Sequence, residues 1–294
     1  MKHIHFIWNP IAGKGNNSIS LSVLRHYFNE EYFNIVLKKS THKKHAVSLT
    51  KESILQGAQI IVACGGDGTI NEVASCLIET PIILGIIPIG SGNGLASNLQ
   101  IPKKLHQALL LIKSQSIKKI DIGCLNTHYF FSNTGFGFSA RVVKNYELSE
   151  NRKLLAYLKA SIKSLKEIEY NNAIEINLNG EKIYANPLLI FISNSNELGY
   201  KVSLTPKASL QDGLLDVLLV TKLNAFKMVM FCLLALFKKH HVLKEVRSFQ
   251  TKHLKISQTK KQAFHAQIDG ESLEIKEDEI NLSILEKSLN VIAY

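Results

Sequence analysis

The chain has 294 residues, of which 46% are apolar and 20% are charged, as in a folded soluble protein with one large domain or two ordinary ones. Lys and Arg number 35 against 24 Asp and Glu, and the net charge of +11 favours anionic partners, although an inert basic surface explains it equally well. The four cysteines form no CxxC pair, which argues against a zinc or redox motif.

The N-terminal segment "MKHIHFIWNP" lacks the long apolar run of a signal peptide. The most apolar window, Met228–Phe237, has ten residues, whereas a membrane-spanning helix needs about 20. We therefore expect a cytoplasmic protein, one that can touch the inner face of a membrane without crossing it.

The first 120 residues alternate between strand and helix patterns. Strand-like runs at 3–8, 33–39, 58–64 and 82–89 are separated by helical stretches at 18–28, 44–57 and 69–79. This alternation predicts a parallel sheet covered on both faces, in which ligands bind at the carboxyl ends of the strands. We place an α/β domain at residues 1–120.

After "KKIDIG" (118–123) strand-like runs dominate, and Asn179-Gly180 in "IEINLNGEKIYA" is a strong hairpin signal. We therefore predict an antiparallel β-sandwich domain at residues 121–294, interrupted by helical inserts near 141–168 and 224–244. The final run, "SLNVIAY" (288–294), is compatible with pairing in either domain.

Three turns rich in small residues follow predicted strands of the first domain: "NPIAGKG" (9–15), "GGDGT" (65–69) and "GSGNG" (90–94). Gly65 and Gly66 let backbone N–H groups approach a ligand closely, and the N-terminus of the following helix favours anions. Asp67 within this turn suits Mg²⁺ binding or proton transfer. The alternative is a tight turn in which Asp67 or Thr69 caps the helix.

The other two turns follow the same logic. In "NPIAGKG", Pro10 fixes the strand exit and Lys14 offers a positive charge. In "PIGSGNGLA" (88–96), Ser91 and Asn93 are able to bond a phosphate, a ribose or a base. Each of these two turns is weak evidence on its own. Because they share their position after predicted strands with "GGDGT", the three together predict a phosphate-binding cradle.

Taken together, these turns resemble those of the diacylglycerol kinase catalytic-domain superfamily, and more closely the bacterial lipid kinases related to diacylglycerol and sphingosine kinases. The resemblance implies an α/β nucleotide-binding N-terminal domain (NAD kinase/phosphofructokinase-like) and a C-terminal antiparallel β-sandwich domain, with ATP between the two. The matching segments are "NPIAGKG", "STHKKHA", "GGDGTINEV", "PIGSGNGLA", "LQDGLLDV" and "IDGE", between residues 9 and 271.

The resemblance also implies a set of nucleotide-binding residues. In the second turn they run from Gly65 to Asn71. Ser91 stands where many relatives have threonine, and a hydroxyl residue opposite the phosphates falls on Ser40 or Thr41. The full set is Asn9, Pro10, Ile11, Ala12, Gly13, Ser40, Thr41, Gly65, Gly66, Asp67, Gly68, Thr69, Ile70, Asn71 and Ser91.

The resemblance places a further Mg²⁺ on "SLQDGL", with Asp212 binding through its carboxylate and Ser209 and Leu214 through backbone carbonyls. Hard oxygen ligands of this kind suit Mg²⁺. Without the resemblance, Asp212-Gly213 reads as a hairpin turn.

In "IDGE", Glu271 is by resemblance the residue that accepts the proton of the lipid hydroxyl, and Asp67 is its rival as general base. The implied activity is transfer of the ATP γ-phosphate to a lipid alcohol of diacylglycerol or sphingoid-base type, within lipid metabolism and phospholipid biosynthesis. An Asp-Gly turn between strands is the alternative reading of this segment.

Two helical segments combine apolar and basic residues, 152–168 and 226–244, and they are candidates for transient peripheral membrane contact. The alternative is that each covers the sandwich core. Two other functions remain open, an NAD kinase-like enzyme and a non-catalytic binder of anionic lipid or nucleic acid. The chain shows no aromatic-basic RNA motif, so we expect no nucleic-acid partner. Oligomeric state is not indicated.

Overall fold

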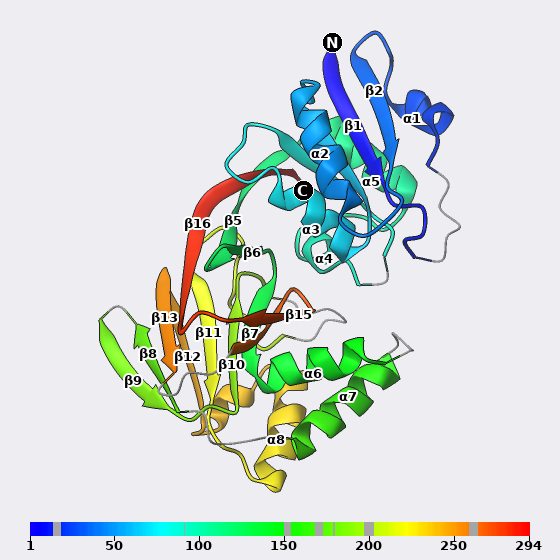
Figure 1. Cartoon of the computed structure of the whole chain (residues 1–294). Helices are drawn as coiled ribbons and strands as arrows, with labels where there is room; N and C mark the ends of the chain where they lie inside the picture. Colours follow the sequence, from blue (N-terminus) through cyan, green and yellow to red (C-terminus); the bar gives the residue numbers. More distant parts are fainter. Residues whose placement is uncertain are drawn as a thin grey trace. The chain divides into compact units, whose positions relative to one another are not determined.

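The computed structural model describes residues 1–13, 19–90, 92–149, 154–167, 173–178, 180–196, 203–258 and 264–294. The chain divides into two compact units (Figure 1). Unit 1 contains Met1–Asp121 and Glu286–Tyr294, and unit 2 contains Ile122–Leu285. The C-terminal residues therefore return to the N-terminal unit.

Unit 1 is built on a parallel sheet. Its strands are β1 (Lys2–Trp8), β2 (Phe33–Lys39), β3 (Ile60–Gly65) and β4 (Ile83–Pro88), in the order β2-β1-β3-β4. The end of β16 (Glu279–Ile292) adds to this sheet, where Asn290 and Val291 pair in parallel with β4. All six residues of β3 are buried, because a central parallel strand is covered on both faces.

Helices cover both faces of this sheet, as the alternating pattern predicts. They are α1 (Leu21–Tyr27), α2 (His45–Leu55), α3 (Asp67–Ser75), α4 (Gly94–Asn98) and α5 (Leu105–Ser114). The connection from β1 to β2 runs along the sheet in one direction, and those from β2 to β3 and from β3 to β4 run in the other. Because such crossovers are right-handed, α1 lies on the face opposite α2 and α3.

Unit 2 contains two antiparallel sheets that pack as a sandwich. One has the order β12 (Val246–Thr251), β11 (Leu215–Val220), β10 (Leu189–Ser193), β7 (Asn133–Gly137), β14 (Phe264–Ile268) and β15 (Glu271–Ile275). The other joins the first part of β16 to β13 (His253–Gln258), β8 (Ile174–Leu178) and β9 (Glu181–Ala185). At its margin, β5 (Ile117–Leu125) pairs with β16 and with β6 (His128–Phe130).

The predicted hairpin is confirmed, since Leu178 pairs with Glu181 across a two-residue loop and Gly180 has a φ of +90°. The predicted fold class is confirmed as well. Residues of both sheets, such as Ile192 and Ile256, share one buried core.

The helices of unit 2 are α6 (Phe138–Glu147), α7 (Leu154–Lys166) and α8 (Ala225–Leu236), and the 3₁₀ helix η1 (His240–Val242) follows α8. They fall at the two predicted inserts, except that α6 begins at Phe138, three residues before the first one. Strand β10 shows how its sheet is covered. Ile190 and Ile192 face the sandwich core, whereas Leu189 and Phe191 join a second apolar cluster with α8 residues. No helix in the described part of the chain is long and apolar enough to span a membrane.

Candidate active site

The first and second predicted phosphate turns follow adjacent parallel strands and lie at one edge of the sheet of unit 1. Trp8, the last residue of β1, is paired with Cys64 of β3, and Gly65 is paired with Pro88 of β4. The turn that begins at Asn9 therefore starts level with the end of β3. Parallel pairing alone brings all three turn segments to the same edge.

Missing side chains allow these turns to touch. A Cβ added to Gly65 would lie 2.5 Å from Oγ1 of Thr69, and one added to Gly90 would lie 2.5 Å from Cα of Gly66. Gly13 has a φ of +68°, and its Cβ would lie 2.4 Å from the carbonyl oxygen of Ile89. All three glycines are thus needed for close packing, and Gly13 is needed for its positive φ as well.

Asn9 links the first turn to the second. Its Nδ2 donates to Oγ1 of Thr69 at 3.1 Å, and its Oδ1 accepts from the backbone N–H of Ile11 at 3.2 Å. The backbone N–H of Asn9 donates to the carbonyl of Cys64. Asn9 thereby fixes the path of the predicted nucleotide-binding segment, in which Ile11 is exposed and Pro10 and Ala12 are half-buried.

Asp67 links the second turn to the third. Its Oδ2 accepts from the N–H of Asn93 at 2.7 Å, and its Oδ1 accepts from the N–H of Gly94 at 2.6 Å, at the start of α4. Hydrogen bonds from backbone amides to a carboxylate are among the stronger ones in proteins. Both carboxylate oxygens therefore position the third turn, a contact that the motif by itself does not reveal.

The N-terminus of α3 supplies the backbone donors that the motif predicts. The first hydrogen bond of this helix runs from Ile70 N–H to Gly66 O. The N–H groups of Asp67, Gly68 and Thr69 precede it and have no carbonyl four residues earlier in the helix. This end of the helix is suited to hold an anion.

In the third turn, Ser91 lies outside the described residues. The Asn93 side chain is buried, and its Nδ2 donates to the carbonyl of Gly90, whereas its Oδ1 has no hydrogen-bond partner among the described residues. Its φ of +58° is a conformation that asparagine tolerates better than most residues. Of the following residues in the second turn, Ile70 is buried and Asn71 is half-buried.

The loop carrying Ser40 and Thr41 follows β2. Ser40 is buried and its N–H donates to the carbonyl of Trp8, whereas Thr41 is exposed and its Oγ1 lies 3.0 Å from Nδ1 of His45. Glu72 of α3 ties this loop down, because its carboxylate accepts from the N–H of Lys44 at 2.9 Å and of Ala46 at 3.2 Å. Sequence reasoning missed Glu72, although it stands inside "GGDGTINEV".

In unit 2, Asp269 and Gly270 form the tight turn between β14 and β15, with φ values of +48° and +85°. The Asp269 carboxylate accepts three backbone N–H bonds, from Phe131 and Ser132 at 2.8 Å and from Asn133 at 3.0 Å. Glu271, exposed, is the first residue of β15. The interpretation of "IDGE" as an Asp-Gly turn between strands is thus compatible with a functional role for Glu271.

Gln267 supports the same turn. Its Oε1 accepts from the N–H of Gly270 at 2.9 Å, and its Nε2 donates to Oδ1 of Asn133 at 2.8 Å. Gln267 and Asn133 are both buried. The start of β15, and with it Glu271, is therefore held by a buried polar network.

The predicted metal loop lies just before β11. Ser209 Oγ accepts from the N–H of Gln211, and Asp212 Oδ1 accepts from the N–H of Leu214 at 3.1 Å, with Gly213 at a φ of +71°. No group of three or more His, Cys, Asp or Glu suited to a metal occurs among the described residues. The loop offers one carboxylate and backbone carbonyls, a donor set that fits Mg²⁺ better than a softer metal.

Burial also shifts the pKa of the Asp216 carboxyl, which lies two residues after the predicted metal loop. Asp216 of β11 is buried, and this burial raises its pKa, while the hydrogen bond that Gln250 donates to Oδ2 opposes the shift.

An α/β unit with interlocked glycine turns, followed in the chain by an antiparallel sandwich, is the architecture that the motifs predict for a lipid-kinase type of protein. Comparison with known families agrees. Residues 3–125 match the diacylglycerol kinase catalytic domain, and residues 132–293 match the YegS C-terminal NAD kinase beta sandwich-like domain. The chain belongs to the diacylglycerol kinase catalytic-domain superfamily, with a C-terminal domain of the YegS type.

Individual relatives cover most of the chain. It is 27% identical to a protein named diacylglycerol kinase from Bacillus subtilis (strain 168), over 92% of this chain and 90% of the relative. It is 31% identical to "Probable lipid kinase YegS" from Escherichia coli O127:H6, over 72% of this chain and 73% of the relative. A solved structure titled as a diacylglycerol kinase from Bacillus anthracis str. Sterne shares the fold, with a TM-score of 0.72 at 18% identity, covering 100% of this chain and 97% of that one.

Proposed function

We propose that this protein is an ATP-dependent lipid kinase that phosphorylates the hydroxyl of a lipid alcohol. One observation carries the proposal. Three turns pack closely at the N-terminus of α3, where a Cβ at Gly13 or Gly90 would collide with a neighbouring turn and one at Gly65 would collide with Thr69. The relatives named as diacylglycerol and lipid kinases support the acceptor class.

The chain's own residues have defined tasks in this proposal. Backbone amides at the start of α3 hold phosphate oxygens, while Asp67 and Asn9 keep the turns around them rigid. Phosphoryl transfer depends on such positioning more than on covalent chemistry. Mg²⁺, when bound with ATP, would neutralise phosphate charge, and Asp212 with the carbonyls of Ser209 and Leu214 would hold a second ion.

In the chemical step the lipid oxygen forms a bond to the γ-phosphorus as the bond from that phosphorus to ADP breaks. The proton of the lipid hydroxyl passes to the carboxylate of Glu271. Asp67 is less suited to this role, because both of its oxygens already accept backbone N–H groups. General-base assistance is typically worth about 10²- to 10⁴-fold in rate.

The test uses purified protein, radiolabelled ATP, MgCl₂ and a panel of diacylglycerols, sphingoid bases and polyprenols, with products separated by chromatography. We expect Glu271→Gln to lose about 10²-fold or more in turnover while its ATP affinity by calorimetry stays unchanged. Glu274→Gln, at an exposed position of the same strand, is the matched control and should behave as wild type.

Near-normal turnover of the Glu271→Gln variant would refute the general-base role. Phosphorylation of NAD, with no lipid product, would favour the NAD kinase-like alternative. A folded protein that takes up no ATP in the presence of Mg²⁺ would overturn the proposed function.

A further inference from the structure

Helix α8 is apolar on every side but is covered on one side alone. Its sequence, AFKMVMFCLLAL, contains Lys227 as its single charged residue. Met228, Phe231 and Ala235 are buried, and the first two join the apolar cluster on the sheet of β10 and β11. A helix that is apolar all round is normally buried all round.

The uncovered face consists of large apolar side chains. Their spacing of three or four residues places them together on the helix surface. Two partly exposed aromatic and three aliphatic side chains present on the order of 500 Å² of apolar area, at the upper end of what monomers expose. Exposed fractions are 74% for Phe226, 59% for Val229, 55% for Leu233, 64% for Leu236 and 73% for Phe237.

Positive charge borders this face. The sequence from Lys222 to Arg247 contains six Lys and Arg residues, and Glu245 is its single carboxylate. That carboxylate is already paired with Lys227. The exposed lysines at the border are Lys238 and Lys239, which directly follow the helix, and Lys244 a few residues further on.

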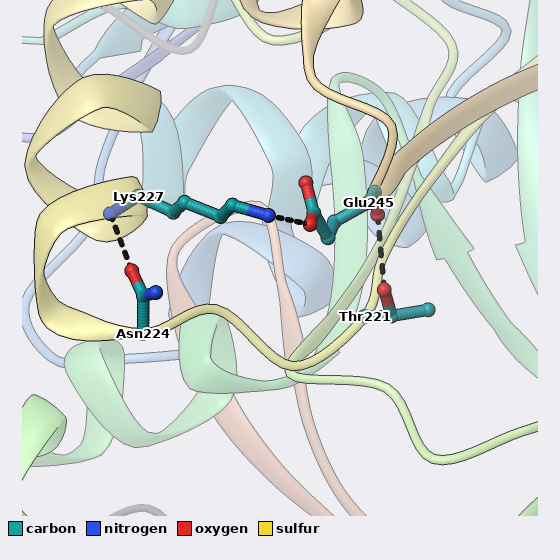
Figure 2. A network of polar contacts seen from close by, with 4 residues as sticks. All are labelled: Thr221, Asn224, Lys227 and Glu245. Atoms are coloured by element: carbon teal, nitrogen blue, oxygen red, sulfur yellow. Dashed lines mark hydrogen bonds and ion pairs between the residues drawn. The ribbon is translucent and has the colours of Figure 1, made fainter.

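The helix is anchored at its first turn (Figure 2). Asn224 Oδ1 accepts from the N–H of Lys227 at 2.8 Å, and Lys227 Nζ forms an ion pair with Glu245. Thr221 Oγ1 donates to the carbonyl of Glu245 at 3.3 Å. Because these contacts fix the helix in place, its exposed face needs little ordering before it binds a partner.

We propose that the exposed face of α8 docks on the surface of an anionic phospholipid bilayer, an inference that rests on the proposed function because it delivers the enzyme to a lipid substrate. Phe226, Leu233 and their apolar neighbours enter the boundary between headgroups and acyl chains. The bordering lysines bind lipid phosphates. This combination of an apolar face and flanking cations is that of interfacial helices.

The charge pattern disfavours a second copy of the chain as the occupant of this face. A symmetric dimer would bring the same patch of each subunit together, and the cationic borders would repel one another. Helix α7 is the other membrane candidate from sequence, and the side chains at 154, 155, 157 and 158 lie outside its described side chains. Among its described side chains Ile162 is the one large apolar group that is exposed, and Leu165 packs against the same cluster as α8.

The experiment is cosedimentation of the full chain with phosphatidylcholine vesicles that contain or lack phosphatidylglycerol. We expect Leu233→Gln/Phe237→Gln to weaken binding to the anionic vesicles by more than about tenfold. Lys238→Gln/Lys239→Gln should weaken binding to anionic vesicles alone and reduce its salt dependence. The matched control, Tyr32→Gln/Leu55→Gln, alters an exposed aromatic and an exposed leucine elsewhere and should bind as wild type.

A second measurement separates this inference from the proposed function. Leu233→Gln/Phe237→Gln should keep wild-type turnover on a short-chain lipid alcohol in detergent micelles and lose turnover on vesicle-borne substrate. Unchanged vesicle binding by this variant overturns the inference, whatever its kinase activity. The inference is also overturned if sedimentation equilibrium shows that the wild-type protein is a dimer and the variant a monomer, while the variant still binds vesicles. Absence of kinase activity with intact vesicle binding instead overturns the proposed function alone.

Discussion

Replacing Asp269 by Asn tests whether the turn before Glu271 depends on the three backbone hydrogen bonds to a carboxylate. The substitution keeps the size of the side chain, and Asn also tolerates the positive φ at this position. It changes one thing, the conversion of one carboxylate oxygen into an NH₂ group. The residues whose N–H groups bond to this carboxylate, Phe131, Ser132 and Asn133, are all buried.

The magnitude follows from the geometry. Oδ1 accepts from Ser132 and Asn133, so an amide oxygen at that position retains two bonds. The NH₂ group then faces the N–H of Phe131, which loses its acceptor, at a cost of about 1–3 kcal/mol. The two remaining bonds lose their charge assistance and weaken by roughly half. We therefore expect unit 2 to lose about 3 kcal/mol of unfolding free energy.

Differential scanning calorimetry is the assay. For a unit of this size about 3 kcal/mol corresponds to a fall in Tm of roughly 6–12 °C. Turnover should fall as well, since the turn positions Glu271. Glu274→Gln makes the same carboxylate-to-amide change at an exposed site and should shift Tm by less than about 2 °C. If Asp269→Asn melts with the control, the three hydrogen bonds do not hold this turn and the reasoning fails.

Two further predictions concern unit 1. Gly65→Ala places a methyl group 2.5 Å from Thr69 and should cost about 1–3 kcal/mol, with weaker ATP binding, whereas Gly68→Ala meets nothing within 4 Å and should fold as wild type. Equal melting temperatures of the two variants, measured with the single tryptophan as the probe, would contradict this prediction. Burial, aided by the charge of Lys38, lowers the pKa of His5 to about 4, so protons bind the unfolded chain first as pH falls from about 6.5 to 4. The free energy of unfolding, measured by urea titration, should decline by up to about 3 kcal/mol as the pH falls across that range, and His5→Leu should flatten this decline. If the stability of the His5→Leu variant falls with pH as steeply as that of the wild type, the prediction is refuted.

Local chemistry was readable from the residues alone. Alternating runs predicted the strands β1 to β4 and the helices α1, α2 and α3, because strand and helix periods differ along the chain itself, whereas α4 and α5 were not predicted. Asn179-Gly180 predicted its hairpin because few other residues adopt positive φ there. "GGDGT" predicted a strand leading into a helix through a turn, and in the structure β3 ends at Gly65 and α3 begins at Asp67, with Gly66 alone between them.

The partners of the key carboxylates depended on the tertiary structure. Asp67 reaches residues 26 and 27 positions away, and Asp269 reaches residues 136 to 138 positions away. Sequence spacing contains no information on such pairs, because the intervening chain can return by many routes. Only the fold of the chain brings Asp67 to the third glycine turn.

Helix α8 is a second case in which the sequence predicts the element and the tertiary structure decides its contacts. Because nearly all of its residues are apolar, no periodicity indicates which face the rest of unit 2 covers. The sequence alone determined that this segment is an apolar helix with cations after it. Which side chains remain in water was decided by how the helix packs on β10 and β11, since burial is a property of the assembled layers and not of the helix alone.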